Sequence, residues 1–346
     1  MIVECEVLEG LAPFVEDEIV DRLGGRATVV GADATAVRVE LARDLAAVLG
    51  LRTAVAAYLV ATYPVPRPRG LLGHRHLTDL AARVRQVIAL HAPGVFTSFR
   101  ISAAGRESAI FGRLAAELAE ATGLIHDPSA GDMLLRVRPA PGGGWEVLLR
   151  LSPRPLSARP WRVRDLPGAL NATLAAAMVE LSGPRAADRV VNLACGSGTL
   201  LVERLLRAPA AATVGVDLDQ RALDAANANV DAAGLTGRVE LVRLDATSTG
   251  LDVGGFDVVL ADPPYGHRMG THAGNEALYP ALLAEAGRLA APGARFVVIT
   301  HELRRFAAAI AGNGRPAWDV ERELQVFQKG HHPKIWLLRR APHPDQ

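Results

Sequence analysis

The chain has 346 residues, 49% of them hydrophobic and 22% charged, which is ordinary for a folded protein of two or three domains and excludes a disordered or fibrous chain. No uncharged apolar stretch approaches about 18 residues, so no membrane span is expected. Glu4, Glu6 and Glu9 in the first ten residues do not fit a secretory signal peptide, and a cytoplasmic protein is expected.

Charge is unevenly distributed along a chain whose net charge is only +1. Residues 1–60 carry 5 arginines against 10 acidic residues, whereas residues 61–170 carry 15 against 8. A basic middle segment is typical of a nucleic-acid-binding module, with a solvated surface as the alternative. The two cysteines, Cys5 and Cys195, are far apart and outside any Cys-x-x-Cys pair, which predicts no structural metal.

The amino-terminal half predicts two α+β units. The first has strands at residues 2–7, 27–30 and 36–41 and a helix at 11–23, and it ends at the proline-rich stretch 63–70. The second has helices at 77–90 and 109–121 and strands at 95–102, 133–138 and 145–151. A Pro- and Arg-rich passage at 152–167 marks its end.

The carboxy-terminal half predicts an α/β fold. Strands are expected at 189–194, 213–217, 239–244, 257–261 and 295–300, separated by helices, which favours a parallel sheet covered on both faces. Two further strands at 324–329 and 334–339 are so close that they must form an antiparallel hairpin. Seven strands with a hairpin at one edge are typical of a Rossmann-like methyltransferase.

Three of these strands end in residues suited to binding a nucleoside. Gly196 and Gly198 follow the first strand, in a Gly-x-Gly turn that opens a helix and lacks the third glycine of a dinucleotide site. Asp217 ends the second strand, where a carboxylate can bind both hydroxyls of a ribose, while Asp219 is expected to cap the next helix. Asp245 follows the third strand, either to accept from an adenine amino group or to cap a helix.

The fourth strand ends in Asp-Pro-Pro-Tyr at residues 262–265. The Asp262 carboxylate and the Pro263 carbonyl can accept the two protons of an amino group, and Tyr265 offers a ring on which a base can stack. The alternative is a rigid Pro-Pro turn with a core tyrosine. Because the first and fourth strands are neighbours in a doubly wound sheet, we expect Gly196 and Asp262 to face one crevice.

With these motifs the chain resembles the THUMP-domain guanine-N2 methyltransferases of tRNA over nearly its whole length. The likeness includes Thr-Ser-Phe-Arg-Ile-Ser at 97–102, Phe-Gly-Arg-Leu at 111–114, Arg-Pro-Trp-Arg at 159–162 and the Asp-Pro-Pro-Tyr-Gly loop. The resemblance implies a ferredoxin-like domain at 1–65, a THUMP RNA-binding domain at 66–158, a linker at 159–175 and a class I methyltransferase domain at 176–346.

The resemblance also implies S-adenosylmethionine (SAM) as cofactor and tRNA as partner. The sequence gives no sign of membrane association or of an obligatory protein partner. One departure is Asn192, which stands where the family usually has Asp. The catalytic residues expected are Asp262, Pro263, Pro264 and Tyr265. The cofactor-binding residues expected are Asn171, Asn192, Ala194, Gly196, Gly198, Thr199, Asp217, Leu218, Asp245, Ala246 and Asp262. The RNA-contacting residues expected are Arg100, Arg113, Arg159, Arg162, Tyr265 and Arg268.

Three hypotheses remain open at this stage. The first is an RNA guanine-N2 methyltransferase. The second is the same chemistry on N6 of adenine, on rRNA guanine or on a glutamine side chain, the last disfavoured by the basic middle segment. The third is an RNA-binding protein whose catalytic half has decayed. The histidine pair at 331–332 has no metal-ligand spacing and is expected in a solvated hairpin turn.

Overall fold

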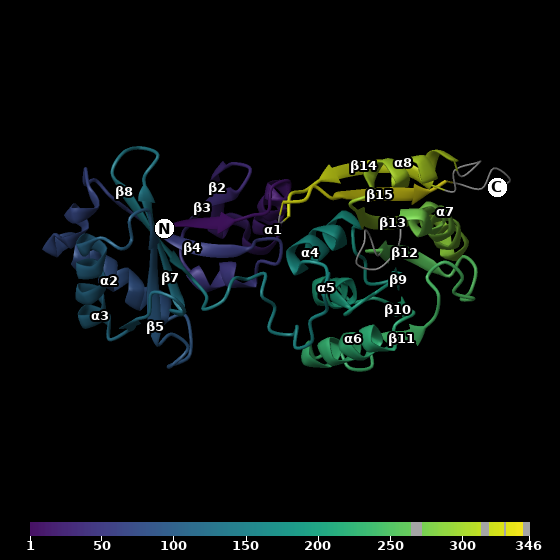
Figure 1. Ribbon diagram of the computed structural model, residues 1–346, viewed down its shortest axis with the longest axis horizontal. Helices are drawn as coiled ribbons and strands as arrows, with labels where there is room; N and C mark the ends of the chain where they lie inside the picture. Colours follow the sequence, from purple (N-terminus) through teal and green to yellow (C-terminus); the bar gives the residue numbers. More distant parts are fainter. Residues whose placement is uncertain (264–271, 313–317, 329, 342–346) are drawn as a thin grey trace. The chain divides into compact units, whose positions relative to one another are not determined.

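The computed structural model describes residues 1–263, 272–312, 318–328 and 330–341, and the side chains of 272–276 are outside the description. The chain forms two compact units. The first comprises residues 1–8 and 12–157, and the second comprises residues 9–11 and 158–346. Each unit is built around its own sheet (Figure 1).

The first unit contains one eight-stranded sheet in the order β2-β3-β1-β4-β8-β7-β5-β6. Its strands are β1 (Ile2–Glu6), β2 (Ala27–Ala32), β3 (Ala36–Leu41), β4 (Ala56–Tyr63), β5 (Ser98–Ala103), β6 (Ile125–His126), β7 (Met133–Pro139) and β8 (Trp145–Arg150). Its helices are α1 (Ala12–Leu23), α2 (His74–Ile88) and α3 (Ala109–Thr122), with short 3-10 turns at Gly24–Arg26, Leu45–Gly50 and Pro68–Leu72. The antiparallel pairing of β4 with β8 joins the two predicted α+β units into one sheet.

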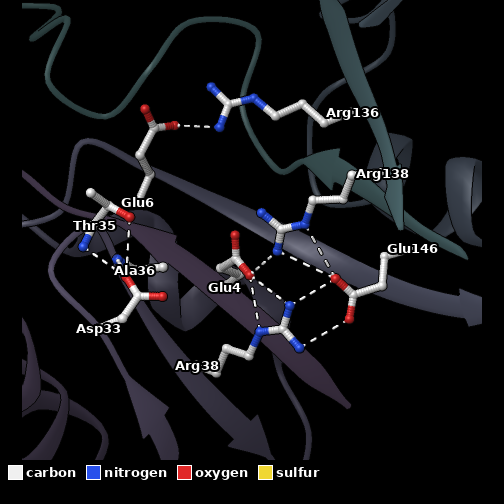
Figure 2. Close-up of polar contacts among 9 residues, drawn as sticks. All are labelled: Glu4, Glu6, Asp33, Thr35, Ala36, Arg38, Arg136, Arg138 and Glu146. Carbon is white, nitrogen blue, oxygen red and sulfur yellow. Dashed lines mark hydrogen bonds and ion pairs between the residues drawn. The ribbon is translucent and has the colours of Figure 1, made fainter. Parts of the chain in front are cut away.

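The two faces of this sheet differ in chemistry. One face carries Val3, Val39 and Leu149, which pack into a core with apolar residues of the three helices. The opposite face carries charged side chains, including Glu4 and Arg38 (Figure 2). Alternation along each strand sends successive side chains to opposite faces. The charged face also holds a small buried apolar cluster, formed by Ala56, Tyr58, Val60, Leu134 and Leu148.

The second unit contains a seven-stranded sheet in the order β11-β10-β9-β12-β13-β15-β14. Its strands are β9 (Arg189–Leu193), β10 (Ala212–Asp217), β11 (Glu240–Arg243), β12 (Phe256–Ala261), β13 (Ala290–Thr300), β14 (Trp318–Gln325) and β15 (Lys334–Arg340). The first five are parallel, and β15 pairs antiparallel with both β13 and β14. The predicted fold class and its terminal hairpin are therefore confirmed.

Helices cover both faces of the second sheet (Figure 1). They are α4 (Ala172–Leu181), α5 (Thr199–Arg207) and α6 (Gln220–Ala232) on one side, and α7 (His272–Leu289) and α8 (Leu303–Gly312) on the other. The α7 and α8 side forms the larger core, where Tyr279, Phe306 and Trp336 pack together. A sheet buried on both faces favours strands that are mostly apolar, as β9 is with Val190, Val191 and Leu193 beside the buried Asn192.

At two places the expected strands differ from the observed ones for a physical reason. Strand β4 was missed because a continuous apolar run such as residues 54–61 carries no period that separates a strand from a helix. Strand β14 ends at Gln325, although it was predicted at 324–329, because its exposed acidic side chains hide the apolar pattern expected of a strand. Helix α4 begins at Ala172, so the last four residues of the segment expected as linker, 172–175, are helical.

Candidate active site

The carboxyl edge of the second sheet brings the predicted motifs together. Leu193 of β9 pairs with Val216 of β10 on one side and with Ala261 of β12 on the other. The residues that follow these positions therefore leave the sheet at one level: the glycine turn after β9, Asp217 at the end of β10, and Asp262 after β12. Asp262 and Gly196 lie at the ends of adjacent parallel strands, as the sequence predicted.

The glycine turn has a left-handed backbone at three positions. Ala194 has φ +53°, Gly196 φ +53° and Gly198 φ +77°. Ala194 is one of two non-glycine residues with positive φ among the described residues, and such strain is most often kept at functional sites. The turn is closed by the N–H of Gly198, which donates to the Cys195 carbonyl at 2.9 Å.

The two glycines have different reasons to lack a side chain. A Cβ at Gly196 would meet nothing within 4 Å, so this part of the turn faces open space that a ligand can enter. A Cβ at Gly198 would lie 3.1 Å from Cβ of Ala226 in α6. Gly198 therefore permits close packing between the start of α5 and α6, while Gly196 leaves the backbone accessible.

Asp217 is held against the glycine turn. Its Oδ2 accepts from the Gly196 N–H at 2.8 Å and its Oδ1 accepts from the Asp219 N–H at 3.0 Å. Each carboxylate oxygen has a second lone pair left for a hydroxyl donor. The neighbouring Leu218 is 59% exposed, which offers an apolar surface beside this carboxylate. Asp219 caps α6 by accepting from the Arg221 N–H, as predicted.

Asp245 lies beyond β11 in a local turn. Its Oδ1 accepts from both the N–H and the hydroxyl of Thr247, at 2.8 and 2.7 Å. These two bonds within the turn account for an aspartate at this position without any ligand. The other carboxylate oxygen, Oδ2, is a further hydrogen-bond acceptor at the same sheet edge. Ala246 is half-buried beside it. No helix lies between β11 and β12, so the helix cap raised for Asp245 from the sequence was wrong, and the contact with an adenine amino group stays a prediction.

Asn192 is fully buried within the sheet. Its Nδ2 donates to the carbonyls of Leu260 at 3.1 Å and Leu193 at 3.3 Å, while its Oδ1 is buried without a partner in the part of the chain that the structure describes. The side chain thus ties β9 to β12 just below the two loops. This favours a positioning role over the direct cofactor contact expected from the sequence.

Asp262 begins the loop after β12, and Pro263 beside it is buried. Loss of water around the carboxyl raises the pKa of Asp262 from 3.8 to about 7. A bound cation would favour the ionised form and lower that pKa again. Pro264, Tyr265 and Arg268 lie outside the described residues, so their predicted roles stay predictions.

The segment before α4, residues 158–171, is the connector, and it is hydrogen-bonded to the start of α5 beside the glycine turn. The Arg162 guanidinium donates to Oγ1 of Thr199 at 2.9 Å and to the Leu170 carbonyl at 2.7 Å, and burial lowers its pKa. Asn171 caps α4, because its Oδ1 accepts from the Thr173 N–H at 2.8 Å. These predicted residues therefore gather around one end of α5, where each already has an internal partner.

Two residues that the sequence did not single out complete this arrangement. Asn229 of α6 is fully buried and donates to the carbonyls of Ser197 and Arg164, so it links the connector to the glycine turn. Glu203 of α5 pairs with Arg159 at 2.8 Å, and both side chains are buried. Arg159, expected to contact RNA, instead anchors the connector to α5. In the sequence, Asn229 and Glu203 could have been noticed because each is a polar residue on the otherwise apolar face of its helix.

The predicted arginines of the first unit differ in exposure. Arg113 is exposed on α3 and lies 3.4 Å from Glu117, whereas Arg100 on β5 is half-buried and donates to the Gly131 carbonyl at 2.6 Å. Arg113 is therefore the more accessible of the two.

A charged cluster that the sequence did not reveal lies on the open face of the first sheet (Figure 2). Arg38 donates to both oxygens of Glu146, at 3.0 and 2.7 Å, and Arg138 pairs with Glu4 and Glu146. The carboxylates are buried, but the Arg38 and Arg138 side chains are 27% and 41% exposed. Together with Arg136 they line a cavity of about 630 Å³. The guanidinium groups thus reach solvent, whereas the carboxylates beneath them are buried.

Two structural absences complete the description. None of the helices that the structure describes is long and apolar enough to span a membrane. Among the described residues, no three His, Cys, Asp or Glu side chains are grouped as metal ligands.

Comparisons with known proteins agree with this geometry. A family model described as the RMKL-like methyltransferase domain (UPF0020) matches residues 159–334. The chain is 29% identical over 198 residues to the Bos taurus protein named tRNA (guanine(6)-N(2))-methyltransferase THUMP3, covering 52% of this chain and 38% of that protein. It is 30% identical over 193 residues to the Thermus thermophilus protein named tRNA (guanine(6)-N2)-methyltransferase, covering 56% of each. The chain thus spans between 38% and 56% of the length of these relatives.

The likeness to a solved structure extends over both units. The crystal structure of TrmN from Thermus thermophilus superimposes with a TM-score of 0.74 at 26% identity. The match covers 98% of this chain and 99% of that chain.

Proposed function

Because this chain belongs to the RMKL-like methyltransferase domain family (UPF0020), we propose that it transfers a methyl group from SAM to the exocyclic N2 of a guanine in tRNA. The observation that supports this most is the position of Asp262 at the end of β12, directly beside the glycine turn after β9. The proposed substrate agrees with the names of the similar proteins from Bos taurus and Thermus thermophilus.

The residues at the sheet edge fit SAM. The open side of Gly196 can receive the ligand, and the spare lone pairs of Asp217 can accept from the two ribose hydroxyls. Leu218 can cover one face of the adenine, and Asp245 can accept from its amino group. When bound, SAM supplies an electrophilic methyl group on a sulfonium.

Asp262 prepares the nitrogen for attack. An amino group conjugated to its ring is a poor nucleophile, because its lone pair is delocalised. The Asp262 carboxylate and the Pro263 carbonyl accept the two N–H protons and fix the direction of the lone pair. The nitrogen forms the new N–C bond as the S–C bond breaks, with the electron pair staying on sulfur, and one proton then leaves the nitrogen. The Asp262 carboxylate, which burial makes more basic than an exposed aspartate, can receive that proton.

The first unit is proposed to hold the RNA. Arg38, Arg136 and Arg138 line one cavity together with Glu4, Glu6 and Asp33, and each of the three arginines is paired with a glutamate. Arg113 is exposed on α3. Guanidinium groups pair with phosphate oxygens and release bound counterions, so RNA affinity is expected to fall with salt. We retain 1–65 and 66–158 as ferredoxin-like and THUMP domains, 159–175 as linker and 176–346 as methyltransferase domain. A tRNA substrate agrees with a cytoplasmic location.

The test is methylation of unfractionated RNA followed by nucleoside mass spectrometry. We expect N2-methylguanosine, and Asp262→Ala is expected to abolish its formation while RNA affinity stays within about 1 kcal/mol, since Asp262 acts on the reacting amine rather than on phosphates. Asp252→Ala, an exposed aspartate before the same strand, is the matched control. N6-methyladenosine as the product would replace the proposal by the adenine alternative. A folded protein that does not bind SAM would favour the third hypothesis, an RNA-binding protein whose catalytic half has decayed.

A further inference from the structure

The turn between β14 and β15 lies at the same sheet edge as Asp262. Ala261 pairs with Val298 of β13, and Thr300 at the end of β13 pairs with Lys334 at the start of β15. Asp262 is thus level with the end of β13, and the residues before Lys334 extend past that level. Neighbouring strands are about 4.8 Å apart, so the β15 end of this turn lies about 10 Å from Asp262 across the sheet.

Two side-chain contacts lie at the end of β13, one with α7 and one with this turn. The Tyr279 hydroxyl is hydrogen-bonded to Oγ1 of Thr300 at 2.8 Å. Burial raises the pKa of Tyr279 to about 12. His301 follows Thr300, and its ring lies edge-on to that of His331 with centroids 5.5 Å apart.

The turn presents rings to solvent. Phe327 is 37% exposed, and its ring lies 4.9 Å from that of His332 at 47°. His331 and His332 are both exposed. The backbone beneath them is fixed, because Gln328 and His331 exchange two N–H to carbonyl bonds of 2.9 Å each. Exposed aromatic rings on a rigid turn are suited to stacking on unpaired bases, and imidazole N–H groups can donate to phosphate oxygens.

We propose that Phe327, His331 and His332 bind the RNA strand next to the target guanine. This inference rests on the proposed function and adds a substrate contact within the catalytic unit itself. The amino group can reach Asp262 only if the guanine is extruded from its stack, which leaves neighbouring bases unstacked. The turn offers exposed rings at the same sheet edge as Asp262.

The experiment measures KM for RNA, kcat and SAM affinity in four variants. Phe327→Ala and His332→Ala are expected to raise KM for RNA about ten-fold, as expected for the loss of one base–aromatic stack, with SAM affinity within about two-fold of wild type. Phe327→Trp keeps a stacking ring and is expected to retain the wild-type KM. Val320→Ala, an exposed residue nearer the opposite end of β14, is the matched control and is expected to change nothing.

Two results would overturn the inference. One is an unchanged KM in a Phe327→Ala variant that binds SAM normally. The other is a fall in kcat at constant KM, which would place the ring in the chemical step or in the support of Asp262. If wild type forms no N2-methylguanosine, the proposed function fails, and the turn is then tested by direct RNA affinity. Equal affinities of wild type and Phe327→Ala in that assay would overturn the inference by itself.

Discussion

The N–H of Gly196 donates to Oδ2 of Asp217 at 2.8 Å, so the glycine turn and the carboxylate proposed to bind the ribose form one connected unit. The bond spans two adjacent parallel strands at the edge where both end. A change in the carboxylate therefore alters both the ligand contact and the support of the turn.

Replacement of Asp217 by alanine is expected to weaken SAM binding about 10- to 100-fold, the range for loss of hydrogen bonds to a charged acceptor. Isothermal titration calorimetry measures this directly. Asp219→Ala removes only the cap of α6, so it should lower stability by about 1 kcal/mol and leave SAM affinity nearly unchanged. Equal SAM affinity in both variants would show that Asp217 does not contact the cofactor.

The raised pKa of Asp262 predicts a pH-dependent stability. Between pH 4 and pH 7 the folded protein holds a proton that the unfolded chain, with an ordinary pKa of 3.8, has released. Stability must therefore fall as pH rises through this window. Three pKa units at about 1.36 kcal/mol each set a ceiling of about 4 kcal/mol, and partial exposure reduces it.

The variant Asp262→Asn lacks this titration. Its free energy of unfolding is expected to exceed that of wild type at pH 8 and to approach it at pH 4, measured by urea unfolding without SAM. The same pH dependence in both proteins would rule out the pKa assignment.

A methyl group at Gly198 should be more damaging than one at Gly234. Both residues have positive φ, +77° and +71°, so alanine is strained at each. Only at Gly198 would the new Cβ press on Ala226, at 3.1 Å, whereas at Gly234 it meets nothing within 4 Å. We expect Gly198→Ala to cost about 1–3 kcal/mol more than Gly234→Ala, as overpacking does. Thermal unfolding of the two variants compares them, and similar melting temperatures would mean that α6 moves away freely.

Asp188 supports the opposite end of the second sheet. It pairs with Arg204 at 3.0 Å and Arg295 at 2.6 Å, and all three side chains are buried. Asp188→Ala leaves two buried guanidinium groups without their carboxylate, and a loss of about 3–5 kcal/mol is expected. Chemical denaturation measures the loss, with the exposed Asp319→Ala as control. A loss below about 1 kcal/mol would mean that backbone carbonyls alone satisfy both arginines.

The local sequence determined the order of the site motifs and the fold of the second unit. Strands that are apolar along most of their length and separated by helices predict a parallel sheet. Parallel strands present their carboxyl ends at one edge. The positions of Gly196, Asp217 and Asp262 at strand ends were therefore enough to predict that they meet.

Tertiary structure alone decided which polar groups are already paired. Glu4 and Arg138 are 134 residues apart along the chain yet hydrogen-bonded on one sheet face, and Arg159 lies buried against Glu203. Asn192 clamps β9 to β12, where a ligand contact was expected. Local periodicity shows which face of a strand or helix is apolar, but a long-range pair depends on which strands become neighbours. That choice follows from the free energy of packing the whole chain.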